Sequence, residues 1–338
     1  MPARRPVPDD ARQIASRQER LITTAQCRSA GMSADMLRRL VQTGAWSRIT
    51  RGVHDTDPAP VASRTVDHRR RRAAWAALLA FGPESIAVGP CSLALLGVAG
   101  LPARVVPQAT LPGARALESR DGIRLRMFDD RMAVVRVRDR YVAAPEWALA
   151  QAVPELDRPW AVAVMDSALH LGLVSAEDLA RAHDLARGRR GVARTHSWWE
   201  LADGRAESPL ETWVRLDCVD GRVPPDTLQV PLVGSSGRER RGDLGWLLDD
   251  GRWVVAEADG AEFHDTPSAA FADRERHNDL VTADVAAVLR FTSADVRMPG
   301  CVATTVRQAL LSTGRHRPAW RRDARTRDHS SAKASAGE

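Results

Sequence analysis

Cysteine is scarce in this sequence, and its placement excludes two common uses of that residue. The four cysteines lie far apart and no two form a CxxC pair, so neither a disulfide framework nor a zinc site is expected. The longest apolar run, AAWAALLAFG, is roughly half of what a membrane-spanning helix needs. The N-terminal MPARRPVPDD lacks the apolar region of a signal peptide. We therefore expect a soluble protein of the reducing cytoplasm, without a membrane segment.

Lysine is almost absent, although the chain is basic. Among 49 lysines and arginines only Lys333 is a lysine, so nearly every positive charge is a guanidinium. The formal net charge is +6 and the isoelectric point is about 10.0. Such a balance favours a nucleic acid or another anionic partner.

The length and composition predict several globular domains. The chain has 338 residues, of which 44% are hydrophobic and 27% charged. A break rich in proline and aspartate, DTDPAP, ends the first segment, and SPLETW opens the third. The basic C-terminal stretch ends in small polar residues, so we expect it to be disordered. The predicted segments are 1–60, 61–206, 207–314 and the tail 315–338.

The first segment predicts two short helices joined by a tight turn. LITTAQCRSAG and MSADMLRRLVQTGAW meet at Gly31, Ser33 suits an N-cap, and Gly44 suits a C-terminal stop. The second helix is amphipathic, with leucine and valine on one face. Its other face is polar and consists of Asp35, Arg38, Arg39 and Gln42.

A β-prone stretch, WSRITRGVHDT, follows these helices and carries Arg48 and Arg51 around Gly52. Two helices and then a basic hairpin is the order of a winged helix-turn-helix. In that fold Arg38, Arg39 and Gln42 would face the DNA major groove, and the hairpin arginines would face phosphates. The alternative is an ordinary amphipathic helix with a solvated face.

The same stretch, ITTAQCRSAGMSADMLRRLVQTGAWSRITRGVH, resembles the N-terminal domain of AbiEi-type antitoxins. The resemblance covers about the first 55 residues of the chain. It implies a winged helix that binds DNA and leaves autoregulation open. It does not by itself imply a toxin partner.

The middle segment gives mixed signals. GIRLRMF and MAVVRVRDRYVA alternate like strands, whereas APEWALAQAV and WAVAVMDSALHLG are typical of helices. Asp166 and His170 are four residues apart, a spacing that more often gives a local surface contact than a metal site. The segment resembles the linker and C-terminal part of antitoxin-like proteins. We interpret it as a mixed α/β spacer or partner-binding domain.

The third segment contains a predicted hairpin, DLGWLL-DDG-RWVVAEADG. A turn centred on Asp250 places Trp246 opposite Val254 and Asp243 opposite Glu257, with Cβ atoms about 5 Å apart. Asp259 shares the face of Glu257 and would lie opposite Arg241.

Two facing carboxylates destabilise a largely apolar hairpin unless something compensates their charge. A divalent cation such as Mg²⁺ could bridge them, because it prefers oxygen ligands. Alternatively one carboxyl is protonated, or the pair is exposed and screened by Arg238, Arg240 and Arg241. The apolar flanking residues favour the cation.

A helix, SPLETWVRLDCV, precedes the hairpin, with Ser208 as its N-cap and Pro209 in its first turn. Glu211 has the spacing of a capping box. It is either a cap alone or a third acidic residue that faces the hairpin.

The order helix, three strands, helix, strand, with SPLE, RGDLGW, AEADGAEFH, DRERHNDL and VLRFTSADV, resembles the PD-(D/E)xK or restriction-endonuclease-like superfamily. More closely, it is similar to a domain family related to very-short-patch-repair endonucleases. The resemblance covers about residues 207–312. The sequence departs from the superfamily because Asp259 stands where the usual catalytic lysine would be.

The resemblance implies a magnesium site at which Asp243 and Glu257 hold the ion, with other divalent metals as options. It implies that His264 moves a proton, contacts a phosphate or has a structural role. Asp259 would hold a second metal or leave the role of base to His264. The DNA backbone would be contacted by Arg274, Arg276 and Asn278.

These observations predict an α+β multidomain protein: a winged helix-turn-helix, a mixed α/β middle domain and a restriction-endonuclease-like α/β domain with a mixed central sheet. Two functions remain open. One is a magnesium-dependent DNA endonuclease or nickase directed by the winged helix. The other is an antitoxin-like transcriptional regulator whose nuclease-like domain is not catalytic. DNA is the expected partner in both, whereas a homodimer and a toxin partner are left open.

Overall fold

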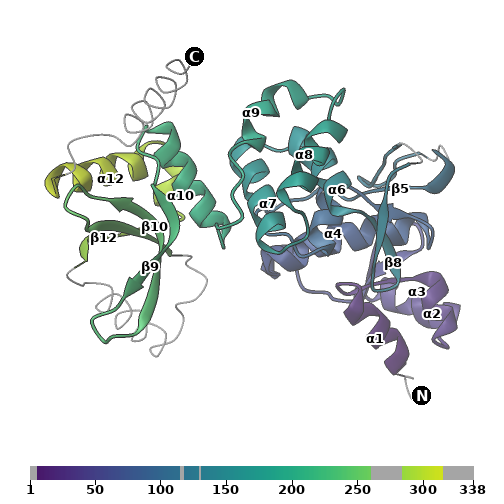
Figure 1. Cartoon of the computed structure of the whole chain (residues 1–338). Helices are drawn as coiled ribbons and strands as arrows, with labels where there is room; N and C mark the ends of the chain where they lie inside the picture. The colour runs from purple at the N-terminus through teal and green to yellow at the C-terminus, as the bar shows by residue number, and fades with distance from the viewer. Residues whose placement is uncertain (1–5, 115–117, 129–130, 260–283, 315–338) are drawn as a thin grey trace, which may run out of the picture. The chain divides into compact units, whose positions relative to one another are not determined.

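The computed structural model describes residues 6–114, 118–128, 131–259 and 284–314. The chain forms two compact units, Met1–Ala202 and Asp203–Glu338, both drawn in Figure 1. Within the described ranges, no helix combines the length and the apolar character that crossing a membrane requires. Each unit contains helices and a mixed sheet, so the predicted mixed α/β multidomain architecture is confirmed.

The first unit opens with a small helical layer against a three-stranded antiparallel sheet of order β1-β3-β2. A cluster of small and apolar side chains, including Ile22, Cys27 and Trp46, forms its core. This is the element order of a winged helix. Its elements are α1 (Asp9–Arg17), β1 (Leu21–Thr23), α2 (Thr24–Ser29), α3 (Ala34–Gln42), β2 (Ser47–Thr50) and β3 (Val53–Asp55).

Side-chain caps explain where the two central helices begin. The Thr23 hydroxyl accepts a hydrogen bond from the Gln26 N–H at 3.1 Å, and the Gln26 carbonyl Oε1 accepts one from the Thr23 N–H at 2.9 Å. Ser33 caps α3 by accepting from the Met36 N–H at 3.1 Å, as predicted. The helix ends before Gly44, whose φ of 72° allows the chain to reverse.

The rest of the first unit packs helices against a five-stranded mixed sheet of order β6-β5-β4-β8-β7. The predicted strand stretch MAVVRVRDRYVA forms the antiparallel hairpin of β7 and β8. The strands are β4 (Ile86–Ala87), β5 (Gln108–Thr110), β6 (Arg124–Leu125), β7 (Val134–Val137) and β8 (Arg140–Ala143). The helices are α4 (Val66–Phe81), α5 (Pro90–Leu95), α6 (Pro145–Ala152), α7 (Arg158–His170), α8 (Ala176–Leu185) and α9 (His196–Trp199), with 3-10 turns at Val61–Ser63, Pro112–Ala114, Val153–Glu155 and Val192–Thr195.

Buried ion pairs attach the winged helix to α4. Asp55, at the end of β3, binds the guanidinium groups of Arg64 and Arg72, and all three side chains are less than 10% exposed. Glu19 binds Arg71 at 2.7 Å and lies 2.5 Å from His68. The basic residues at and just before the start of α4 therefore stabilise the contact between the winged helix and α4 within the first unit.

The second unit contains a four-stranded sheet of order β12-β11-β10-β9. Strands β9, β10 and β11 are antiparallel neighbours, and β12 runs parallel to β11, so this sheet is mixed as predicted. Its core joins Trp246 and Val254 of the sheet to Val214 and Val306 of two helices. The elements are α10 (Pro209–Asp220), β9 (Thr227–Val233), β10 (Glu239–Leu247), β11 (Trp253–Asp259), β12 (Val285–Thr292), a 3-10 turn at Asp295–Arg297 and α12 (Cys301–Ser312).

Two glycines allow neighbouring strands of this sheet to approach each other. A Cβ atom on Gly242 would lie 2.2 Å from Cγ1 of Val255, and one on Gly245 would lie 2.2 Å from Cγ2 of Val230. Both distances are far inside van der Waals contact. The glycines of RGDLGW therefore make room for the second apolar cluster of the sheet, which contains Val230 and Val255.

Candidate functional site

The α3 helix presents the polar face that the sequence predicts. Asp35, Arg38, Arg39 and Gln42 are all exposed, and no residue of the helix is fully buried. Arg38 Nη1 lies 2.5 Å from Asp35 Oδ1, one helical turn earlier. This ion pair directs the Arg38 side chain along the helix, whereas the side chains of Arg39 and Gln42 have no hydrogen-bond or ion-pair partner within the described ranges.

The predicted basic hairpin is formed by β2 and β3. Arg48 and Arg51 are exposed, and Gly52 has a φ of 78° in the turn between the strands. Arg48 pairs with His54 across the two strands. The hairpin therefore places positive charge beside the helix-turn-helix, as a wing requires.

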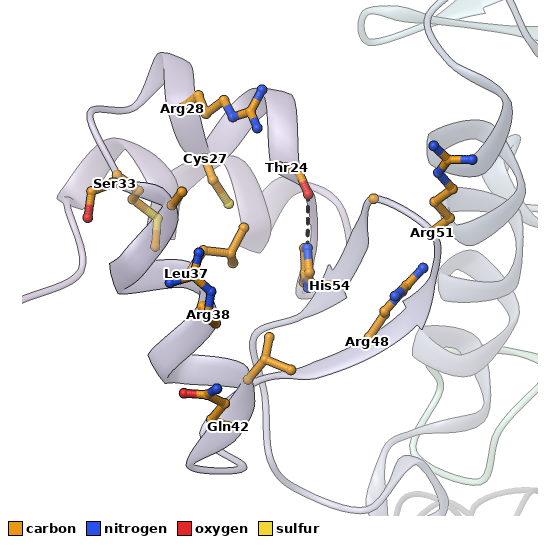
Figure 2. A pocket seen from close by; sticks show the side chains of 14 residues that line it. Thr24, Cys27, Arg28, Ser33, Leu37, Arg38, Gln42, Arg48, Arg51 and His54 are labelled. Carbon is orange, nitrogen blue, oxygen red and sulfur yellow. Dashed lines mark hydrogen bonds between the residues drawn. The ribbon is translucent and has the colours of Figure 1, made fainter.

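A hollow of about 530 Å³ lies between the helix-turn-helix and the wing. Figure 2 shows α2 and α3 on one side of it and the β2–β3 hairpin on the other. Residues from four elements and their connecting turns converge on it. They are Thr24, Cys27, Arg28, Met32, Ser33, Ala34, Leu37, Arg38, Val41, Gln42, Arg48, Arg51, Gly52 and His54.

His54 joins the two sides of the hollow. Its Nε2 atom lies 3.0 Å from the hydroxyl of Thr24, the first residue of α2, and Figure 2 marks this hydrogen bond. The residue is 7% exposed. Burial, and then the positive charge of Arg48, lower the pKa of His54 below its usual value. His54 is therefore a neutral structural link at neutral pH.

Sequence reasoning missed three residues of this hollow. Arg28, Thr24 and His54 line it, yet none of them is on the predicted recognition helix or at the predicted arginine positions of the wing. A weak signal was present, because Arg28 follows the capped start of α2 by one helical turn. The approach of Thr24 and His54, 30 residues apart, depends on the tertiary fold.

The acidic candidates lie at the end of the β10–β11 hairpin, in the second unit. The predicted register is confirmed, because Trp246 pairs with Val254. The pairing stops at Leu244 and Ala256, one step before Asp243 and Glu257. There the Asp243 carboxylate accepts a hydrogen bond from the Ala258 N–H at 2.7 Å. Asp243 is half-buried and Glu257 is buried.

Ser208 caps α10 as predicted, but the Glu211 carboxylate binds the Glu207 N–H and not the Ser208 N–H that a capping box requires. The Glu211 N–H donates to the Ser208 hydroxyl at 3.2 Å, as in an N-cap. The Glu211 carboxylate Oε2 accepts from the Glu207 N–H at 2.9 Å and from Gln229 Nε2 at 3.0 Å. Burial raises the pKa of Glu211 to about 7, and the nearby negative charge of Asp243 adds to the increase. Glu211 is thus a buried acid in the first turn of α10 that is close enough to Asp243 to feel its charge.

Asp259 has a partner that the sequence did not predict. Its carboxylate binds Nε of Arg290 on β12, whereas Arg241, the expected neighbour, binds Glu207 at 2.9 Å. In the parallel register of β11 and β12, Arg290 is the residue aligned with Glu257. A guanidinium from the neighbouring parallel strand therefore takes the place next to Asp259 that the sequence assigned to Arg241.

The described residues do not complete a metal centre by themselves. Nowhere in those ranges do three or more histidine, cysteine, aspartate or glutamate side chains form a group that could hold a metal ion. The carboxylates of Asp243 and Glu257 have the oxygen chemistry that Mg²⁺ prefers. His264 and the predicted backbone contacts Arg274, Arg276 and Asn278 lie outside the described residues.

Comparison with known proteins supports the N-terminal assignment. Residues 9–53, from α1 into β3, match the family described as "Transcriptional regulator, AbiEi antitoxin". The uncharacterized proteins MT2308 and Rv2248, from two strains of Mycobacterium tuberculosis, are each 35% identical over 141 residues. Those residues are 42% of this chain and 51% of each relative, so the chain spans about half the length of the curated relatives it matches. The N-terminal part of the chain is thus similar to an AbiEi-type regulator domain.

Proposed function

We propose that the protein is a DNA-binding regulator whose winged helix contacts its target through α3 and the β2–β3 wing. One observation carries the proposal: within the matched residues, an exposed polar helix face and two exposed wing arginines border the same hollow. Arginine and glutamine are suited to the base edges of the major groove, and wing arginines are suited to phosphates.

The test measures DNA binding by fluorescence anisotropy at several salt concentrations. We expect the wild-type protein to bind duplex DNA with an affinity that falls as salt rises, because bound arginines release counterions. Arg39→Ala should weaken binding by about 1 to 3 kcal/mol and relax the sequence preference, as expected for a residue that reads bases. Arg12→Ala removes an equal charge from α1, where Arg12 pairs with Asp9, and should have little effect.

A second candidate function is a magnesium-dependent DNA endonuclease or nickase in the second unit. Two observations favour it: the hairpin register that brings Asp243 and Glu257 to one end, and the raised pKa of Glu211 beside Asp243. In this proposal Asp243 and Glu257 hold the ion. When bound, the ion would supply an activated water and stabilise charge on the phosphate.

Nicking of supercoiled plasmid in several divalent metals tests this candidate. Wild-type protein should nick the plasmid, and Asp243→Ala and Glu257→Ala should not. Glu239→Ala on the same hairpin, an exposed position, is the matched control and should retain activity. Equal inertness of all four proteins would remove the endonuclease from consideration. A metal-induced rise in melting temperature that Asp243→Ala abolishes would separately locate the ion.

A further inference from the structure

The hollow beside α3 is strongly cationic. Arg28 extends from α2, Arg38 from α3, and Arg48 and Arg51 from the wing (Figure 2). Its lining residues include no carboxylate, and Asp35, which pairs with Arg38 at 2.5 Å, is not among them. The side chains of Arg28 and Arg51 have no hydrogen-bond or ion-pair partner in the described part of the chain. An anionic occupant would therefore gain contacts without breaking existing ion pairs at these two arginines.

The start of α3 adds to this field. Ser33 and Ala34, the N-cap and first residue of the nine-residue helix, line the hollow. The N-terminal end of a helix carries a partial positive charge, because its first N–H groups lack partners within the helix. The hollow thus combines a helix N-terminus with guanidinium groups.

The floor of the hollow is apolar. Leu37 and Val41 line it from successive turns of α3, together with the buried side chains of Met32 and Cys27. Leu37 and Val41 are only half-buried, which leaves apolar surface next to the arginines. This combination suits an occupant that alternates charged and apolar groups, as phosphates and deoxyriboses alternate along a DNA strand.

The two sides of the hollow are held at a defined separation. His54 links β3 of the wing to Thr24 at the start of α2, and the Thr24 N–H donates to the Gly52 carbonyl at 2.9 Å. A binding site with walls fixed before the ligand arrives loses less entropy on binding. The hollow is therefore arranged as a preformed groove.

We propose that this hollow binds the sugar–phosphate backbone of one DNA strand, with Arg28 on α2 and Arg51 on the wing contacting phosphates from opposite sides. The inference rests on the proposed DNA-binding function and deepens it. Arg39, which does not line the hollow, then remains free to read bases. Positive charge distributed over three elements suits a row of phosphates better than a single small anion.

The experiment compares full-length Arg28→Ala, Arg28→Lys and the control Arg12→Ala in anisotropy titrations with two duplexes of unrelated sequence. Arg28→Ala should weaken binding to both duplexes by the same factor, about five- to tenfold near 0.1 M salt, and lower the salt slope by about one. Arg28→Lys should restore most of the slope, since it keeps the charge. Inorganic phosphate and a nucleoside monophosphate are added as competitors, and neither should displace the duplex at concentrations that match its phosphate content.

The outcomes separate this inference from the function on which it rests. If Arg39→Ala weakens binding but Arg28→Ala leaves affinity and salt slope unchanged, the winged helix binds DNA and the hollow does not hold its backbone. If Arg28→Ala weakens only one duplex, Arg28 reads bases and the backbone assignment is wrong. Displacement by a nucleoside monophosphate would indicate a small-ligand site instead. If the wild-type protein binds neither duplex, the proposed function fails with the inference.

Discussion

The basic hollow and the acidic end of the β10–β11 hairpin use charge in opposite ways. In the hollow, the arginine side chains project from the surface and the neutral, buried His54 lies beneath them. At the hairpin, Glu257 and Glu211 are buried, Glu211 accepts hydrogen bonds from neutral donors, and the neighbouring Asp259 pairs with Arg290 of β12. Exposed arginines are available to a ligand at little cost, whereas buried carboxylates must already be compensated within the fold. The arginines of the first region are therefore open to a ligand, whereas the carboxylates of the second already take part in contacts within the fold.

The largest effect is expected from Asp55, the last residue of β3, which binds two buried arginines. Asp55→Ala leaves the buried guanidinium groups of Arg64 and Arg72 without their shared carboxylate, so we expect unfolding to require about 3 to 5 kcal/mol less free energy. Urea denaturation measures this loss. Asp57→Ala removes the more exposed partner of Arg64 and should have a much smaller effect. Equal losses of stability in the two variants would contradict the stabilising role of the buried ion pairs between Asp55 and the two arginines.

A smaller effect that depends on pH is expected from Glu211. The folded carboxyl has a pKa of about 7, above its ordinary value of 4.5, so the folded state retains this proton to higher pH than the unfolded chain. Its contribution to stability is therefore full below pH 4.5, declines as pH rises towards about 7, and then stays constant.

Urea denaturation between pH 5 and 8 tests this prediction. The wild-type protein should lose roughly 1 to 3 kcal/mol over this range relative to Glu211→Gln, which has no titrating carboxyl. Glu239→Gln, exposed on β10, should behave like the wild type. If Glu211→Gln shows the same pH profile as the wild type, Glu211 is not the buried acid described above.

The smallest effect is expected from the Asp259–Arg290 pair. Both side chains are about one-third exposed or less, at 27% and 33%, so solvent weakens their attraction. A double-mutant cycle with Asp259→Asn and Arg290→Gln should give a coupling of about 0.5 to 1 kcal/mol in the free energy of unfolding. A coupling near zero would mean that Arg290 does not compensate Asp259.

The N-terminal elements were predictable because their signals are local. Ser33 as N-cap, Gly44 after the helix and the exposed face with Arg38 all follow from residues within one or two helical turns of each other. The hairpin register was predictable for the same reason, since its turn joins adjacent strands. The position of Glu211 near Asp243 was only one of two alternatives, because a capping spacing is local and a contact between helix and sheet is not.

The sequence by itself determined the helix caps, the polar face of α3, the basic wing and the pairing of Trp246 with Val254, because periodicity and turn chemistry act over short distances. Which partners the other charged side chains bind was decided only by the tertiary structure. It placed the arginines of the α4 run against Asp55 and Glu19, Arg28 and His54 around one hollow, and Arg290 beside Asp259. These partners are separated by 17 to 52 residues, as for Arg72 with Asp55 and Arg71 with Glu19, so their choice depends on how whole elements pack.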